Sequence, residues 1–292
     1  MTGDPQLTWN LISDVEQLFD FQFMVNAYRA GTIVAVTAAV IGWFMVLRRQ
    51  TFSGHTLALA SFPGASAAFL VGLNPIYGFF AFAMAGALVI SVFARPGQRT
   101  HSQESAIVGT LQALALAFGF LFVSLSHRNI TGVQSLLFGS FIGITNEQVI
   151  TLFVGALIAL AIVLSIARPL FFASIDPDVA AARGVPVRAL DVVFLLILGV
   201  AAAESSQIIG SLLVFALLVL PAAAAELLSV KPILSLIIAI ALALLVTWLG
   251  LALSYYTDYP IGFHVTSLAF GAYLLAHARR KLSPFWAAGA RR

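Results

Sequence analysis

The sequence contains no cysteine, which excludes disulfide bridges, thiolate metal centres and thioether-linked haem. Charged residues are scarce as well: they make up 9% of the chain, whereas an ordinary soluble domain has about 25%. Apolar residues take their place, since 61% of the 292 residues are hydrophobic and the mean hydropathy is +1.01. This composition indicates a chain that is solvated largely by lipid rather than by water.

Motifs of catalysis and nucleotide binding are also missing. The sequence has no G-x-x-x-x-G-K-[ST] phosphate-binding loop and no H-E-x-x-H zinc motif. Its five histidines are scattered, at His55, His101, His127, His264 and His277. We therefore expect no enzymatic activity and no resident cofactor in this chain. The net charge of +3 does not indicate nucleic-acid binding, because the basic residues lie at the ends of the apolar runs.

Long apolar runs follow one another between residues 24 and 278. A helix of about 20 apolar residues is long enough to cross a bilayer, so the sequence predicts an all-α, polytopic transmembrane bundle. About nine spans are predicted: 24–47, 53–72, 79–95, 105–126, 147–171, 187–203, 207–228, 233–255 and 262–278. A short polar hinge, residues 204–207, separates two of them. Merging 187–228 into one bent span gives eight, and this alternative stays open.

Residues 133–143 are apolar but too short to span a membrane. We expect a short helix there, packed inside the bundle or dipping in from one side.

Basic residues gather on one side of the predicted bundle. If that side holds the ends of the first, third, fifth, seventh and ninth spans, it collects 13 of the 15 lysines and arginines, and only Arg29 and Arg128 lie elsewhere. By the positive-inside rule that side is the cytoplasm. We therefore expect a multi-pass protein of the cell membrane, with its N-terminus outside and its C-terminus in the cytoplasm.

This arrangement divides the chain into three segments. Residues 1–23 form an extracytoplasmic segment, in which 8–22 have the apolar spacing of an amphipathic surface helix. Residues 24–278 form the transmembrane domain, which is surrounded by membrane lipid. Residues 279–292 form a basic cytoplasmic tail.

The longest predicted cytoplasmic loop, residues 172–186, contains its own helix signals. Asp176 is a suitable N-cap, and Pro177 occupies the first helical position, where a missing N–H costs nothing. Gly184 and Pro186 end the helix. The sequence therefore predicts a short helix near 176–186 on the cytoplasmic side.

Four segments resemble the permease subunits of manganese/zinc ABC importers, the ABC-3 type of integral membrane protein. They are VLRRQTFSGHTLALASFPG from Val46, LLFGS from Leu136, IIGSLLVFALLVLPAAAA from Ile208 and SYYTDYPIG from Ser254. The resemblance implies a type II ABC importer-like permease that imports a divalent metal ion of the manganese, zinc and iron class. It also implies three partners: a separate ABC ATPase subunit, an extracytoplasmic metal-binding protein and a second permease copy.

The resemblance gives the cytoplasmic loop a role. In the family, a DPexAxxxGxP loop docks on the ATPase, and Asp176, Pro177, Ala180 and Gly184 match it. We expect these residues, together with the small Ala181, to couple the chain to ATP hydrolysis.

The metal ligands of the family are changed in this chain. Similar permeases carry an aspartate directly after the glycine that matches Gly54 and a histidine four residues further on, where this chain has His55 and Leu59. An Asp/His pair at this spacing shares one helical face and can ligate one cation. Ionisable groups are costly at membrane depth, which makes them candidates for transient metal contact. The candidates are His55, Glu204, Asp258 and His264.

Three other functions stay open. The loss of the Asp/His pair also suits an ABC permease for a chelated metal or another small solute. A proton- or sodium-coupled secondary transporter would need buried carboxylates in mid-membrane, and the sequence places none there clearly. A degenerate, non-transporting subunit of the same assembly is the third alternative.

Overall fold

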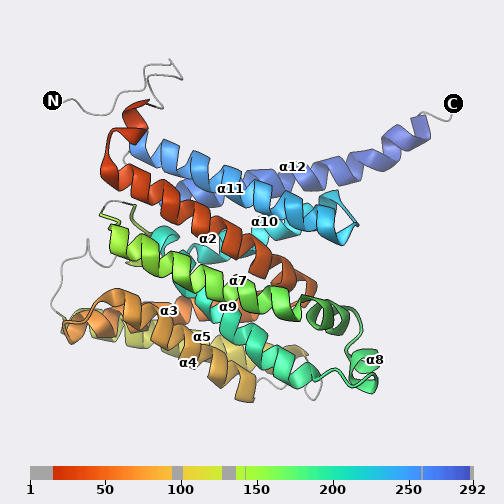
Figure 1. The fold of residues 1–292 in the computed structure, drawn as a ribbon, viewed down its shortest axis with the longest axis horizontal. Coiled ribbons are helices and arrows are strands. Elements are labelled where there is room, and N and C mark those ends of the chain that lie inside the picture. The colour runs from red at the N-terminus through yellow and green to blue at the C-terminus, as the bar shows by residue number, and fades with distance from the viewer. Residues whose placement is uncertain (1–15, 94–100, 127–135, 142, 258, 290–292) are drawn as a thin grey trace.

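A computed structural model shows the chain as a bundle of helices (Figure 1). It describes residues 16–93, 101–126, 136–141, 143–257 and 259–289. The main helices are α2 (Gln22–Leu47), α3 (Thr51–Leu70), α4 (Pro75–Phe93), α5 (His101–Leu125), α7 (Asn146–Ile175), α8 (Pro177–Ala182), α9 (Val187–Ile209), α10 (Val214–Leu228), α11 (Pro232–Tyr256) and α12 (Ile261–Gly289). The described residues contain no strand, so the predicted all-α fold is confirmed.

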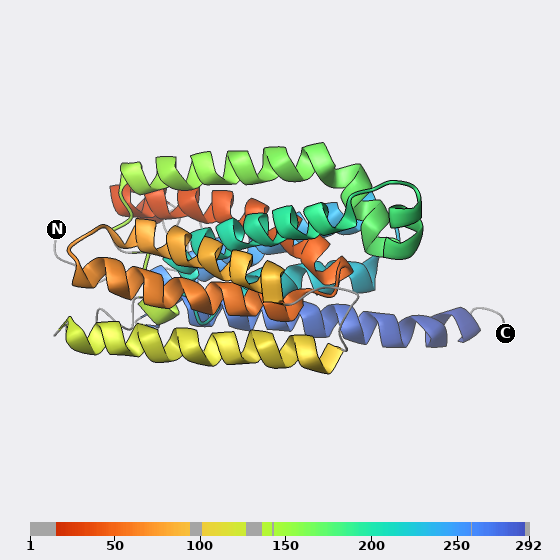
Figure 2. The same cartoon turned by 90° about the horizontal axis from the view of Figure 1, so that it is seen from below.

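The long helices run roughly along one axis, and Figure 2 shows the same alignment after a 90° turn. Seven described helices are long and apolar enough to cross a membrane, namely α2, α4, α5, α7, α9, α11 and α12. The other two predicted spans correspond to α3 and α10. They fall outside this group because α10 has only 15 residues and α3 contains a histidine, a proline and several serines.

Among the seven candidate spans, α2 and α9 lie deepest in the bundle. The most apolar stretches of α2 and α9 are each 72% buried, whereas those of α5 and α7 are only 11% and 22% buried.

Small residues allow close helix contacts, which is typical of membrane bundles. Gly64 of α3 packs backbone to backbone against Gly78 of α4, and a Cβ atom on either glycine would collide with the other helix.

The polar hinge predicted at 204–207 is not a break. Helix α9 continues to Ile209, and the chain leaves the helix only at residues 210–213. Within this patch Ser206 connects the helix to its neighbour: Ser206 Oγ donates to the carbonyl of Ala202 at 2.7 Å, and Ser61 Oγ of α3 donates to Ser206 Oγ at 3.0 Å. The predicted end of this span at residue 203 is therefore wrong by six residues.

Residues 136–141 fill the break between α9 and α10. The carbonyls of Leu136 and Leu137 accept hydrogen bonds from the backbone N–H groups of Ser211 and Leu212, both at 3.1 Å. Residues 136–138 form one helical turn, which agrees with the short helix expected inside the bundle; residues 133–135 and 142 lie outside the described part. Broken backbone inside a membrane needs such protein partners because lipid offers none.

Two glycines make this contact possible. Gly139 and Gly210 have φ angles of +82° and +86°, and a Cβ atom on either would collide with the backbone of the other segment. Gly139→Ala should therefore lower the free energy of unfolding by about 2–4 kcal/mol through backbone strain and overpacking. Thermal unfolding of the purified protein in detergent measures this change.

Gly143→Ala is the matched control for that substitution. Gly143 has a φ of +90°, but nothing lies within 4 Å of its missing side chain, so only the backbone strain of about 1–2 kcal/mol remains. Equal losses in the two variants would show that the 136–141 segment is not tightly packed.

The two terminal segments differ from their predictions in extent. Of the amphipathic segment 8–22, residues 8–15 lie outside the described part, and 16–19 are helical. At the other end, α12 continues through the predicted tail as far as Gly289, because Ala278 to Leu282 favour helix. The predicted division between span and tail at residue 278 falls within this helix and stays a prediction.

Candidate functional site

The short helix α8 connects α7 to α9 at one end of the bundle (Figure 2). Its N-cap is Asp176, whose Oδ1 accepts a hydrogen bond from the backbone N–H of Val179 at 3.0 Å, and Pro177 begins the helix. Gly184 follows the helix with a φ of +82°, a conformation that favours glycine. The helix expected in this loop is thus present, with the capping residues that were expected.

Only part of α8 is available to a partner. Ala180 is fully buried against its own chain, and its carbonyl accepts a hydrogen bond from the N–H of Val185 at 3.0 Å. Ala181 is exposed, as are Pro177 and Val179. A small residue at position 180 lets α8 pack on the bundle, whereas Ala181 lies on the outer face; the docking role of both residues stays a prediction.

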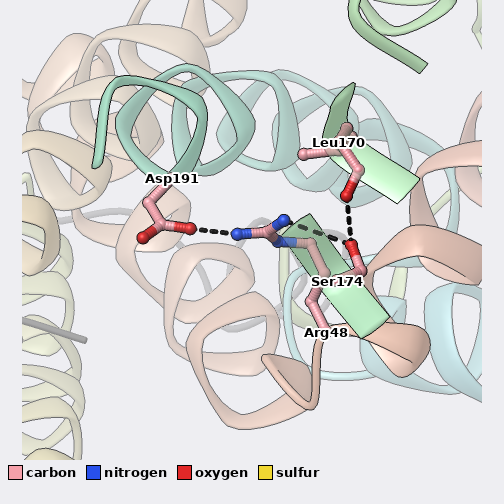
Figure 3. A network of polar contacts seen from close by, with 4 residues as sticks. All are labelled: Arg48, Leu170, Ser174 and Asp191. Atoms are coloured by element: carbon pink, nitrogen blue, oxygen red, sulfur yellow. Dashed lines mark hydrogen bonds and ion pairs between the residues drawn. The ribbon is translucent and has the colours of Figure 1, made fainter. Parts of the chain in front are cut away.

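A buried ion pair connects α2 to α9, close to the C-terminal end of α7 (Figure 3). Arg48, at the C-cap of α2, pairs with Asp191 of α9, and the two side chains are only 6% and 10% exposed. Arg48 also donates to Ser174 Oγ of α7 at 3.2 Å, and Ser174 donates in turn to the carbonyl of Leu170 at 2.6 Å. The guanidinium carbon lies 5.2 Å from the ring centre of Phe194. One side chain therefore joins α2 to both helices that flank α8.

His55 lies in the first turns of α3, shortly after the C-terminal end of α2 at Arg48. It is half-buried, and its ring centre is 4.9 Å from that of Phe215 on α10, edge to face. Its Nδ1 atom is buried and has no hydrogen-bond partner among the described residues. Leu59, at the second family position, is 1% exposed in the core. The two family positions thus face into the bundle, but only one carries a ligand atom.

Glu204 is completely buried in α9, so it is not a solvated hinge residue. Neither carboxylate oxygen has a hydrogen-bond partner within the described part of the chain. The carboxylate lies over Gly155 of α7, where a Cβ atom would come within 2.5 Å of Oε1. The absence of a side chain at Gly155 is what makes room for this group.

His264 lies in the first turn of α12 and is 7% exposed. Its Nε2 atom is 3.1 Å from Thr257 Oγ1, just after the end of α11. The neighbouring candidate Asp258 lies outside the described residues. The described contacts therefore hold His264 at the turn between α11 and α12.

These candidates do not converge on one metal site. The Ser61–Ser206 bond aligns α3 with α9, and His55 precedes Ser61 by six residues, about 9 Å along the helix, whereas Glu204 lies near the level of Ser206. The described residues contain no group of three or more His, Asp or Glu side chains that could hold a metal ion together. The arrangement can offer a cation single contacts at different depths.

The match to a family model decides the identity of this bundle. The model of the ABC 3 transport family covers residues 20–280. The chain belongs to this family.

Individual relatives agree with this ABC 3 assignment. The chain is 29% identical to the chelated iron transport system membrane protein YfeC of Yersinia pestis, over 86% of this chain and 84% of that protein. It is 28% identical to the manganese transport system membrane protein MntC of Halalkalibacterium halodurans, over 75% and 74%. A solved structure of PsaBC from Streptococcus pneumoniae in complex with Fab shows the same fold, with a TM-score of 0.80, 22% identity, and coverage of 91% of this chain and 95% of that chain.

The Arg48–Asp191 ion pair was not predicted from the sequence of this ABC 3 family chain. Asp191 lies inside the predicted span 187–203, where a lone carboxylate is costly and so signals a cation nearby. The partner is 143 residues away in the chain, however, and no local spacing connects the two.

Proposed function

We propose that the chain is the membrane-spanning permease subunit of an ABC importer for a divalent metal ion. The observation that carries the proposal is the family match over residues 20–280. Relatives named for manganese and chelated iron transport indicate the class of cargo. A separate ATPase chain would dock on the outer face of α8, and a second permease copy would complete the path. An extracytoplasmic metal-binding protein would deliver the ion, and this chain itself hydrolyses no ATP.

Nine spans and an outside N-terminus belong to this proposal. Helix α2 begins at the end of the bundle opposite α8, and α12 runs back to the α8 end (Figure 2). Arg48, Arg183, Arg188 and Lys231 also lie at the α8 end, as the positive-inside rule expects of the cytoplasmic side. A protease-sensitive tag at the N-terminus should be cleaved in intact cells, and one at the C-terminus only after lysis. Cleavage of both tags in intact cells would contradict this topology.

Transport through this chain needs no tight site of its own, because the described candidates offer single contacts. His55 is half-buried and has an unpartnered ring nitrogen, so it can bind a passing cation through one bond. Glu204 and His264 lie further from the α8 end and would act earlier on an inward path; Asp258 is proposed beside them from the sequence alone. Zn²⁺ binds imidazole readily, whereas Mn²⁺ prefers oxygen ligands.

The permease proposal is tested with the purified complex of this chain and its ATPase. ATP hydrolysis and uptake into proteoliposomes are measured with Mn²⁺, Zn²⁺, Fe²⁺ and no metal, in the presence of the metal-binding protein. Stimulation by one of these ions supports import of the free ion. If no metal changes the rate of ATP hydrolysis and none is taken up, the proposal is overturned.

A chelated metal is the second candidate cargo. The relative YfeC is named for chelated iron, and the replacement of the family's ligand pair by His55 and Leu59 removes a site for a bare ion. The same assay with iron supplied as a chelate decides between the two. Uptake of the chelate without uptake of the free ion would favour this candidate.

His55→Ala should reduce metal uptake about fivefold, because one lost imidazole contact is worth about 1 kcal/mol or slightly more. The fold should survive, since the half-buried ring makes no hydrogen bond with the described residues. His277→Ala on α12 serves as the control and should transport normally. The pair His55→Asp with Leu59→His should hold Mn²⁺ or Zn²⁺ longer, because both ligands then share one face. Wild-type uptake by His55→Ala would make His55 a structural residue.

A further inference from the structure

A groove of about 920 Å³ lies between α2, α7 and α11, at the end of the bundle opposite α8. Its walls are almost entirely apolar and include Val25 and Ile33 of α2, Phe153 of α7 and Leu249 of α11. Its size lies within the range of about 300–1,000 Å³ that is common for small-molecule sites. The groove is separate from the ion pair at α8 and from His55.

Among the described residues that line the groove, Arg29 is the one with a charged side chain. It is exposed, and it makes no ion pair or hydrogen bond with any residue in the described part of the chain. It is also one of the two basic residues that lie away from the cytoplasmic side of the predicted topology. A guanidinium within a predicted membrane span is energetically costly without an anion nearby. Arginine binds phosphate through two parallel hydrogen bonds.

The depth of Arg29 suits a headgroup. It follows Gln22, the first residue of α2, by seven residues, which is about 10 Å along the helix. Helical side chains lean towards the N-terminus, so the guanidinium reaches back towards the membrane surface. Trp248 of α11 lies at the same level, where its Nε1 donates to Thr32 Oγ1 at 2.9 Å. Tyrosine and tryptophan are enriched at this interface, and Tyr28 also lines the groove.

We propose that this groove binds one phospholipid with an anionic headgroup, whose phosphate contacts Arg29 and whose acyl chain lies along the groove. From Val25 to Ile33 the groove extends about 12 Å along α2, close to the roughly 15 Å depth of one leaflet. The rim continues onto the exposed apolar side chains of Ile150 and Phe153, which face the surroundings of the bundle. Arg29 lies midway between Val25 and Ile33 along α2, so a phosphate at its guanidinium leaves the apolar wall towards Ile33 for an acyl chain.

Trp248 is the reporter for this site, because it lines the groove and is 46% exposed. The full-length chain and its ATPase are reconstituted in vesicles that contain either phosphatidylglycerol or phosphatidylcholine with brominated acyl chains, which quench nearby indoles. Subtracting the signal of Trp248→Phe isolates the quenching at Trp248. The wild type should be quenched by brominated phosphatidylglycerol at a mole fraction about tenfold lower than by brominated phosphatidylcholine, because both lipids carry a phosphate but only the choline headgroup adds a cation that repels Arg29.

Arg29→Gln should abolish this preference while quenching by phosphatidylcholine persists. The matched control is Arg168→Gln, since Arg168 is an exposed arginine of α7 that does not line the groove. This control should keep the preference. Ala252→Phe, which narrows the groove and keeps Arg29, should weaken quenching by both lipids.

Two results would overturn the proposal. Equal quenching of the wild type by both lipids would show that Arg29 selects no anionic headgroup. No quenching by either lipid would show that a second copy of the chain, or another part of the assembly, covers the groove. Neither result bears on metal import, so the two proposals fail independently.

Discussion

Arg48→Met should lower the free energy of unfolding by about 3–5 kcal/mol, because it removes the cation from a buried ion pair and leaves Asp191 charged in the core. Asp191→Leu should cost a similar amount, since it leaves the guanidinium behind. Transport should fall to background in both variants, because the ends of α2, α7 and α9 are no longer held together beside α8. Thermal unfolding in detergent and uptake into proteoliposomes measure the two effects.

The double variant Arg48→Met with Asp191→Leu separates stability from coupling. Replacing both charges by apolar side chains of similar size is often neutral, so the double variant should unfold close to the wild type. We still expect poor transport, because Ser174 loses its bond from Arg48, which fixes the C-terminal end of α7 to the end of α2. A double variant that is stable and transports normally would show that the ion pair serves only the fold.

Arg48→Lys is the conservative variant in this series. Lysine keeps the charge but offers a single point contact, whereas the guanidinium reaches Asp191 and Ser174 at the same time. It should keep most of the stability and lose part of the transport. A lysine variant with full transport would indicate that charge alone is sufficient at this position.

The sequence predicts the framework of this fold well because hydropathy alone determines where a chain can cross a bilayer. In the part of the chain that the structure describes, each predicted run falls on a helix, and seven of these helices are long and apolar enough to cross a membrane, while α3 is less apolar and α10 is shorter. The α8 helix is also predictable, since Asp176, Pro177 and Gly184 are local signals that act within a few residues.

The sequence-based predictions failed where a residue distant in the sequence determines the local structure. The polar patch at 204–207 looks like a hinge, yet Ser206 is satisfied by Ser61, 145 residues away, and the helix continues. The end of α9 depends on Gly210 and on carbonyls from residues 136 and 137. The orientation of Ala180 towards the bundle likewise depends on how α8 packs, and no periodicity shows this in so short a helix.

Ala181→Arg should disrupt docking of the ATPase without unfolding the permease. The side chain is exposed on the outer face of α8, and arginine is a good helix former, so the helix should persist. A bulky charge in a close-packed contact should reduce recovery of the ATPase through a tag on this chain more than tenfold, and uptake should be lost with it. Co-purification and uptake into proteoliposomes measure these losses.

Ala180→Arg is the comparison that separates docking from folding. Ala180 is fully buried, so an arginine there should displace α8 and lower the melting temperature of the permease as well. Ala181→Arg should leave that temperature unchanged, because the side chain of Ala181 is exposed in the part of the chain that the structure describes. If Ala181→Arg recovers the ATPase and transports like the wild type, α8 does not dock through this face. If it melts early as Ala180→Arg does, the loss of transport follows from the fold, and the coupling contact lies elsewhere at this end of the bundle.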